Sequence, residues 1–210
     1  MSEPTIIRVK DNKDKQRTYA YWKNRYKVAV KDQFYFEGIM IDYALIEDRL
    51  TSILFHSGVM PNRQTLNMTA KSTKKQLHRI IQAPFGDYKE NEPVRLKNIS
   101  GKIRVIRAIL IWANTNSDDC DKDRYLSALK RQYESIDAEE MLDVLKQLDS
   151  WCDYRNELVH ATLNKNLESL SENLAERTVE GFNIACYLDN KERIIKKGNH
   201  IRKAANLGVN

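Results

Sequence analysis

The stretch LDSWCDYRNELVHATL, residues 148–163, places Arg155, Asn156 and His160 within six positions. A guanidinium can hold an anion through paired hydrogen bonds, and an imidazole exchanges a proton near neutral pH. The same side chains would also serve as a polar seam between packed helices. The stretch therefore allows two interpretations: a site that performs chemistry, or buried polar groups that satisfy one another.

Helical geometry separates two of these side chains. Five residues of a regular α-helix turn through about 140° and rise about 7.5 Å, so Arg155 and His160 do not share a face. Asn156 and His160 are four residues apart and do share one. Arg155 lies near an apolar stripe that includes Cys152 and Val159, where an unpaired charge is costly. We therefore expect Arg155 to find its partners at a seam between helices or subunits.

Apolar residues at three- and four-residue steps predict long helices on both sides of this stretch and elsewhere in the chain. The predicted helices cover 33–57, 71–83, 99–116, 121–135, 137–160 and 166–197. Asp32 is expected to cap the first at its N-terminus, Gly58 to end it, and Asp137 to cap the fifth. The sequence thus predicts an all-α domain, a bundle of about five to six helices.

The composition agrees with a soluble, helix-rich globular protein. Of 210 residues, 41% are hydrophobic and 30% charged, with only 7 Gly and 4 Pro for turns. The formal charge of +6 is compatible with a nucleic-acid partner but does not establish one. We divide the chain into a basic N-terminal arm over 1–32, a helical domain over 33–190 and a basic tail over 191–210.

Both basic ends leave alternatives open. Aromatic residues of the arm, beside Lys23, Arg25 and Lys27, are expected to pack on the helical domain, although they could instead stack with bases. The tail would either follow an RNA backbone or form a solvated helix end. These alternatives bear on whether the protein holds RNA outside the Arg155 stretch.

Cysteine and histidine spacing predicts neither a disulfide framework nor a metal site. Cys120, Cys152 and Cys186 lie far apart without a CxxC pair, which is typical of free thiols in a reducing compartment. Cys152 is expected to be a core residue. The histidines show no metal-ligand pairing, so neither metal nor cofactor is expected. The N-terminus lacks an apolar signal core and no run could span a membrane, which predicts a cytoplasmic protein without a membrane partner.

The segment RNELVH resembles the Arg-x(4–6)-His motif of the HEPN superfamily, with Arg155, Asn156 and His160 at the matching positions. The resemblance implies a small all-α domain in which a polar residue follows the Arg and the motif joins two long helices. Many members are metal-independent RNases of toxin–antitoxin, abortive-infection and CRISPR systems, in which a dimer unites two motifs. Some carry a Tyr two residues after the His, as a target for modification; here that position is Thr162.

The spacing alone also occurs twice elsewhere, from Arg49 to His56 and from Arg193 to His200. Those arginines are followed by Leu50 and Ile194, not by a polar residue. The polar residue after Arg155 and the position between two helices therefore select 155–160.

The resemblance implies an endoribonuclease in which the RNA 2′-hydroxyl attacks the adjacent phosphate. His160 would transfer the proton, Arg155 would brace the phosphate, and Asn156 would hold either by hydrogen bonds. Glu47 and Asp48 could orient Arg155 or His160, although a structural or solvated role is favoured. The expected partners are RNA, a second copy of the chain, and an antitoxin or regulatory protein. The alternatives are a non-catalytic HEPN-like module that binds RNA, nucleotide or protein, and a purely structural bundle.

Overall fold

The computed structural model describes residues 11–60, 74–85, 94, 96–115, 123–161 and 172–206, which form helices joined by turns and short connections. No strand occurs within these ranges, so the predicted all-α class is confirmed. The α-helices are α1 (Asn12–Lys31), α2 (Tyr35–His56), α3 (Lys74–Gln82), α4 (Ile99–Ala113), α5 (Arg124–Glu134), α6 (Ala138–Ala161), α8 (Leu174–Lys196) and α9 (His200–Ala204). Short 3-10 segments, Ala83–Phe85 and Lys197–Asn199, follow α3 and α8.

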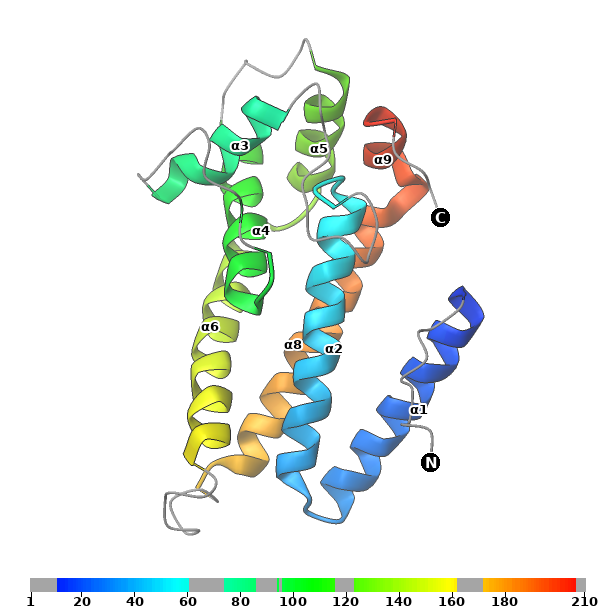
Figure 1. Ribbon diagram of the computed structural model, residues 1–210, viewed down its shortest axis with the longest axis vertical. Helices are drawn as coiled ribbons and strands as arrows, with labels where there is room; N and C mark the ends of the chain where they lie inside the picture. Colours follow the sequence, from blue (N-terminus) through cyan, green and yellow to red (C-terminus); the bar gives the residue numbers. More distant parts are fainter. Residues whose placement is uncertain are drawn as a thin grey trace, which may run out of the picture.

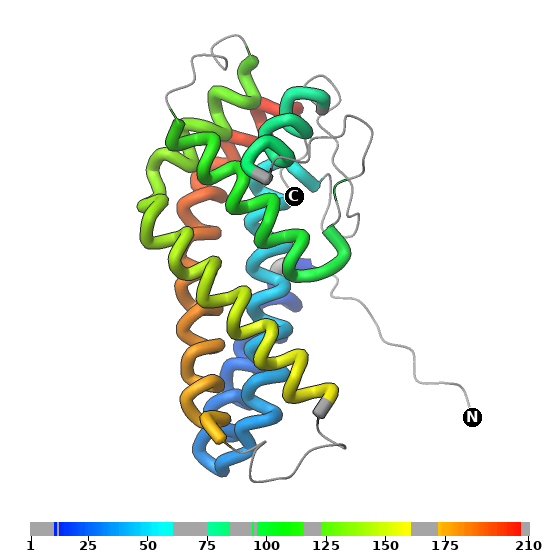
Figure 2. Tube along the Cα trace, turned by 90° about the vertical axis from the view of Figure 1, so that its left-hand side faces the viewer, coloured from blue at the N-terminus to red at the C-terminus, as the bar shows by residue number. Residues whose placement is uncertain are grey.

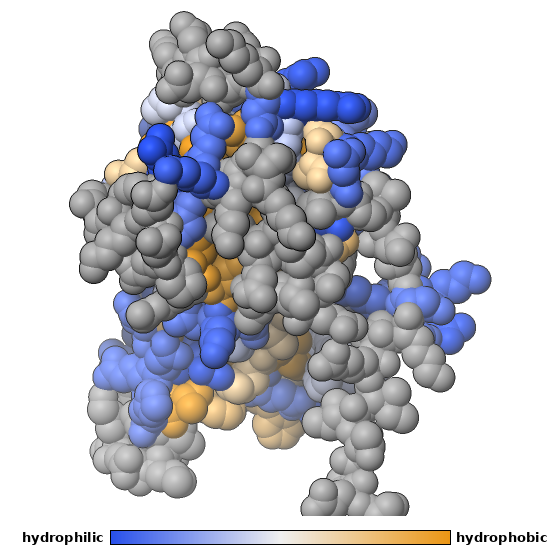
Figure 3. Space-filling model, turned by 45° about the horizontal axis from the view of Figure 1, so that its top comes forward, coloured by the Kyte–Doolittle hydropathy of each residue, from blue (hydrophilic) through white to orange (hydrophobic). Residues whose placement is uncertain are grey.

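Helices α2 and α8 lie side by side and run in the same direction, while α6 runs antiparallel to both (Figures 1 and 2). Side-chain pairs hold α2 and α8 in register: Ser52 donates to Glu192, and Arg49 donates to Asp189. The interior is apolar and is contributed by every long helix. From α2 alone it includes Ile39, Ile46, Leu50, Ile53 and Leu54, all fully buried. In an oblique view toward the end that bears α5 and α9, hydrophilic residues cover much of the coloured surface, and hydrophobic residues show in patches between them (Figure 3).

Two glycines allow close approach between the central helices. A Cβ on Gly38 of α2 would lie 2.5 Å from Thr178 of α8, and one on Gly181 of α8 would lie 2.6 Å from the Trp151 ring of α6. Trp151 also donates from its indole nitrogen to the Arg177 carbonyl at 2.8 Å. The two contacts of Trp151 fix α6 against α8 one turn before Arg155.

The N-terminal residues 12–31 form α1, which packs against α2 and α8 through its inner face. Tyr26 is buried, stacks on Phe182 at 4.3 Å and donates to the Thr178 carbonyl. The prediction that Asp32 caps the following helix is wrong, because Asp32 is the C-cap of α1. The chain then turns through Gln33, at φ 62°, and α2 begins at Tyr35.

The end of α2 follows the prediction, since Gly58 adopts φ 71° directly after the C-cap residue Ser57. Positive φ is the conformation that glycine accepts at a helix end without a steric penalty. Helix α4 begins as predicted, with Asn98 accepting from the Gly101 amide, but it ends at Ala113, three residues before the end of the predicted range. Asp137 likewise accepts from the Glu140 amide and caps α6.

Residues 191–206 continue the helical body beyond the predicted tail boundary. Helix α8 extends to Lys196, and α9 returns the chain to the end of α2 (Figure 1). There Arg202 is buried over the Phe55 ring at 3.7 Å and donates to the Phe55 and Met60 carbonyls. The C-terminal segment therefore contributes a buried cation to the core.

Candidate functional site

The three predicted site residues lie in the last turns of α6, at the end of the bundle away from α5 and α9 (Figure 1). Arg155 is half-buried, and Asn156 and His160 are exposed. Trp151 fixes the preceding turn against α8, and the buried Leu158, seven residues later, lies on the same face of α6. The backbone that carries the candidate site is thereby held by packing along that face.

Arg155 points from α6 onto α2. Its guanidinium carbon lies 4.1 Å from the centroid of the Tyr43 ring, a cation–π contact, and Nη2 lies 3.7 Å from Sδ of Met40. Nη1 donates to Oδ1 of Asn156 at 3.2 Å. Nε is buried without a hydrogen-bond partner among the described residues. Arg155 thus lies in the expected seam between helices, but its hydrogen-bonding capacity is only partly used.

No carboxylate among the described residues pairs with Arg155, in contrast to several other arginines of the bundle. Arg49 pairs with Asp189 and Glu192, Arg107 with Asp149, and Arg177 with Glu180. The charge on Arg155 is therefore stabilised only by an aromatic face, a sulfur and an amide oxygen. Because Nε is buried, an external anion could contact this guanidinium only through the part of the half-buried side chain that remains exposed.

Tyr43 provides a neutral face for this cation. Burial, and then the charge of Glu47, raise the pKa of Tyr43, while Arg155 acts in the opposite direction. Glu47 itself accepts from the buried Lys102 of α4 at 2.9 Å. The Glu47–Lys102 ion pair therefore lies one helical turn beyond the aromatic contact, on the same face of α2.

His160 lies beyond Arg155 on a different face of α6. Both residues belong to one continuous α-helix, so the divergence of about 140° expected from the spacing applies. Asn156 shares the face of His160 and accepts from Arg155. The structure therefore joins Arg155 to Asn156 directly, whereas His160 extends from the last turn of the helix.

The two acidic residues considered as orienting groups have other partners. Glu47 binds Lys102 of α4, and Asp48 accepts from Lys15 and Tyr19 of α1. Both carboxylates thus have structural pairings, the role favoured from the sequence. Cys152 is buried, and burial raises the pKa of its thiol to about 12, so it does not supply a thiolate near neutral pH.

The other two matches to the Arg–His spacing lie in unlike surroundings. Arg49 and His56 are both directed at the buried Glu192, whose Oε1 lies 3.5 Å from Nε2 of His56. Arg193 is 71% exposed and pairs with Asp189 one turn earlier in α8. The first pair belongs to the interior of the bundle, and the second lies on its surface.

The sequence placed Met40 and Tyr43 on the apolar face of the predicted helix but did not assign them to the candidate site. Met40 and Tyr43 lie at three-residue spacing on the predicted helix, with Phe36 one turn earlier, so they form one row along α2. Which helix this row faces depends on tertiary packing. The pairing of the row with Arg155 was therefore not predictable from periodicity alone.

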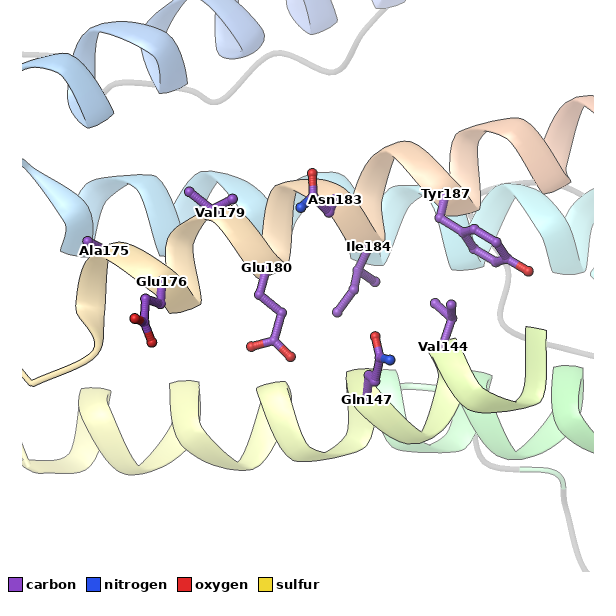
Figure 4. Close-up of a pocket in the computed structure, with 9 residues that line it drawn as sticks. All are labelled: Val144, Gln147, Ala175, Glu176, Val179, Glu180, Asn183, Ile184 and Tyr187. Carbon is purple, nitrogen blue, oxygen red and sulfur yellow. The ribbon is translucent and has the colours of Figure 1, made fainter. Parts of the chain in front are cut away.

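A groove between α6 and α8 was also not predicted. It has a volume of about 690 Å³, and Val144 and Gln147 of α6 point toward Glu180 and Ile184 of α8 across it (Figure 4). Gln147 precedes Asn156 by nine residues, which is about 180° around the helix. The groove and the Asn156–His160 face therefore lie on opposite sides of α6.

Within the described ranges, no three His, Cys, Asp or Glu side chains form a group that could hold a metal ion. In the same part of the chain, no helix is long and apolar enough to cross a membrane. Thr162, the position at which the resemblance departs from some family members, lies outside the described residues.

Comparisons with models of protein families, with curated proteins and with solved structures found no match to this chain.

Proposed function

We propose that the protein is a metal-independent endoribonuclease of the HEPN type, acting in antiphage defence or in a toxin–antitoxin system. The observation that supports this most directly is the state of Arg155. It is a half-buried guanidinium that no carboxylate among the described residues neutralises, and it is hydrogen-bonded to an exposed Asn one turn before an exposed His. A phosphodiester would supply the missing negative charge.

The chemistry uses the nucleophile that RNA carries. The 2′-hydroxyl attacks the adjacent phosphorus and the bond to the 5′-oxygen breaks, which leaves a 2′,3′-cyclic phosphate and a 5′-hydroxyl. His160 takes the proton from the 2′-hydroxyl or gives one to the departing 5′-oxygen. Arg155 neutralises the charge that develops on the phosphate, and Asn156 aligns the guanidinium.

A second copy of the chain completes this site in the proposal. Arg155 and His160 diverge by about 140° around α6, so both do not point at one phosphate from the same side. One motif also contains a single His, whereas the reaction requires an acid and a base. Two copies related by a twofold axis would supply both groups in one cleft.

The test is cleavage of total RNA by purified protein in EDTA, with mapping of the cut ends. We expect cleavage by the wild type, loss of cleavage in Arg155→Ala and His160→Ala, and no cleavage when the scissile nucleotide lacks its 2′-hydroxyl. The matched control is Arg193→Ala and His200→Ala, a second exposed Arg and His with similar spacing at the other end of the bundle. Circular dichroism establishes that each variant is folded.

The outcomes separate the candidate functions. Retained cleavage in both Arg155→Ala and His160→Ala would exclude this site. RNA or nucleotide binding without cleavage by the wild type would instead favour the non-catalytic module. Equal toxicity of the wild type and the two site variants on expression would point to the same conclusion.

A further inference from the structure

Helix α1 carries the positive charge of the protein. It contains seven Lys or Arg residues and a single acidic residue, Asp14. Its excess of positive charge equals the +6 of the whole chain, so the remaining residues are balanced in formal charge. Helix α1 also lies at the edge of the bundle, on the opposite side of α2 and α8 from α6 (Figure 1).

The inner face of α1 is already occupied by contacts with α2 and α8. Tyr26 stacks on Phe182, and Arg25 forms a bidentate pair with Glu37. Tyr19 and Lys15 bind Asp48. The packing of the helix is thus satisfied without the aromatic residues that remain on its outside.

The outer face of α1 exposes aromatic side chains among cations. Tyr21 is 61% exposed and Trp22 is 42% exposed, and their rings meet edge to face at 5.1 Å. Arg17, Asn24 and Val28 continue the row of Tyr21 along the helix, as expected for steps of three and four residues. Exposed lysines flank this row, namely Lys13, Lys27 and Lys31. No carboxylate among the described residues pairs with these lysines.

We infer that this outer face of α1 binds single-stranded RNA, with Tyr21 and Trp22 stacking on bases and the flanking cations contacting phosphates. A single strand is favoured because its unpaired bases offer faces for stacking, which a duplex does not. The choice of RNA over other single strands rests on the proposed function. Binding at α1 would hold a substrate on the protein without contributing to the chemistry at Arg155.

An anionic membrane surface fits this face less well. A helix that lies in a membrane interface needs a continuous apolar stripe that can enter the acyl region. The exposed row on α1 consists of Arg17, Tyr21, Asn24 and Val28. Polar and less polar residues alternate along it, so it contains no continuous apolar stripe. Tyr and Trp among cations are instead the side chains by which proteins stack single-stranded bases.

The experiment measures binding of a labelled uridine 20-mer by fluorescence anisotropy, in a His160→Ala background that prevents cleavage. We expect Tyr21→Ala/Trp22→Ala to weaken binding by about tenfold or more, because each stacked base contributes about 1–3 kcal/mol. The binding constant of a single strand falls as salt concentration rises, with a negative slope in a log–log plot. We expect Lys27→Gln/Lys31→Gln to make this slope less steep by about 0.7 for each lost phosphate contact. The matched control, Lys196→Gln/Lys197→Gln, removes two exposed cations at the end of α8 and should change neither value.

Tryptophan fluorescence gives a readout that a structural role would not produce. Trp151 is fully buried and Trp112 is half-buried, so base stacking should quench Trp22 above all. An unlabelled uridine 20-mer should therefore quench the emission, and Trp22→Phe should abolish the quench while the protein still binds.

Three results would overturn the inference. The first is unchanged RNA binding in the Tyr21/Trp22 variant. The second is a concentration-dependent dimer that this variant loses, which would make the face an interface between copies. The third is a shift of Trp22 emission with anionic phospholipid vesicles but not with RNA. Because binding is measured without cleavage, failure here is distinct from failure of the proposed reaction.

Discussion

Arg49 of α2 and Glu192 of α8 form an ion pair inside the bundle, with 2.5 Å between Nη1 and Oε2. The same guanidinium also binds Asp189, and the second oxygen of Glu192 accepts from Ser52. Because α2 and α8 run in parallel, these pairs determine the register of the two central helices. The Arg–His spacing that begins at Arg49 therefore belongs to a structural network.

Removing the cation from this network should destabilise the fold strongly. In Arg49→Met, Asp189 and Glu192 would lose their buried partner, and breaking a buried pair from one side typically costs about 3–5 kcal/mol. Urea denaturation would measure the free energy of unfolding. The control is Arg17→Met, where an 83% exposed side chain lies 3.9 Å from Asp14 and should contribute less than about 1 kcal/mol. Equal losses in the two variants would contradict a stabilising network.

Asp42 should make the stability of the protein depend on pH. It is fully buried on α2, and neither carboxylate oxygen has a hydrogen-bond partner among the described residues. Burial raises its pKa from 3.8 to about 8. The folded protein therefore keeps a proton that the unfolded chain releases near pH 4, and the free energy of unfolding should fall by about 1.4 kcal/mol per pH unit between about pH 4 and pH 8.

The comparison of wild type with Asp42→Asn isolates this contribution, since other titrating groups affect both proteins alike. The variant should gain stability relative to wild type as pH rises from 5 to 8, and the difference should level off above the folded pKa. The matched control is Asp143→Asn, which makes the same substitution at an exposed carboxylate. A constant difference for Asp42→Asn would mean that the folded protein holds Asp42 ionised.

Gly181 should be intolerant of even a methyl group. A Cβ there would lie 2.6 Å from the Trp151 ring, so Gly181→Ala forces α6 and α8 apart or the indole out of place. Overpacking of this kind typically costs about 1–3 kcal/mol, although alanine itself favours a helix over glycine. Trp151→Leu makes room, so the double variant should be more stable than the sum of the single losses predicts. Thermal denaturation of the four proteins would measure this coupling.

The sequence predicted those helices whose apolar residues recur regularly. Helix α4 begins where it was expected because Ile99, Ile103 and Ile106 mark one buried face, although it ends at Ala113, three residues before the end of the predicted range. Spacing could also have predicted that Asp42 is buried. It lies three residues after Ile39 and four before Ile46, and so falls on the buried stripe of α2. Asp32 was misassigned because residues 12–31 are too polar to stand out as a helix, and an Asp before an apolar run is typical of an N-cap.

Side-chain partners were less predictable than helices. Glu47 and Asp48 are neighbours in sequence, yet they face α4 and α1 respectively. Nothing in the spacing of α2 determines which helix packs on which side. For the same reason, the sequence predicted that Arg155 needs a seam partner but could not identify Tyr43. Local periodicity gives the buried face of a helix, whereas the identity of the neighbour depends on the whole topology.

Tyr43 should act on the proposed cleavage as a positioning residue for Arg155. Tyr43→Phe keeps an aromatic face 4.1 Å from the guanidinium and should retain activity, whereas Tyr43→Leu removes the cation–π contact. We expect the leucine variant to lose about tenfold or more in kcat, because a misplaced charge stabilises the transition state poorly. KM should change less if Arg155 acts mainly on the developing charge.

The matched control for this prediction is Tyr154→Leu. Tyr154 lies on the other side of α6 and supports Arg177 through a similar contact, at 5.1 Å, that belongs to the packing against α8. Its loss should lower stability slightly and leave kcat unchanged. If Tyr43→Leu and Tyr154→Leu reduced cleavage equally in folded protein, the effect would come from a loosened α6. Loss of activity in Tyr43→Leu alone, with rescue by Tyr43→Phe, would identify the aromatic face as the feature that positions Arg155.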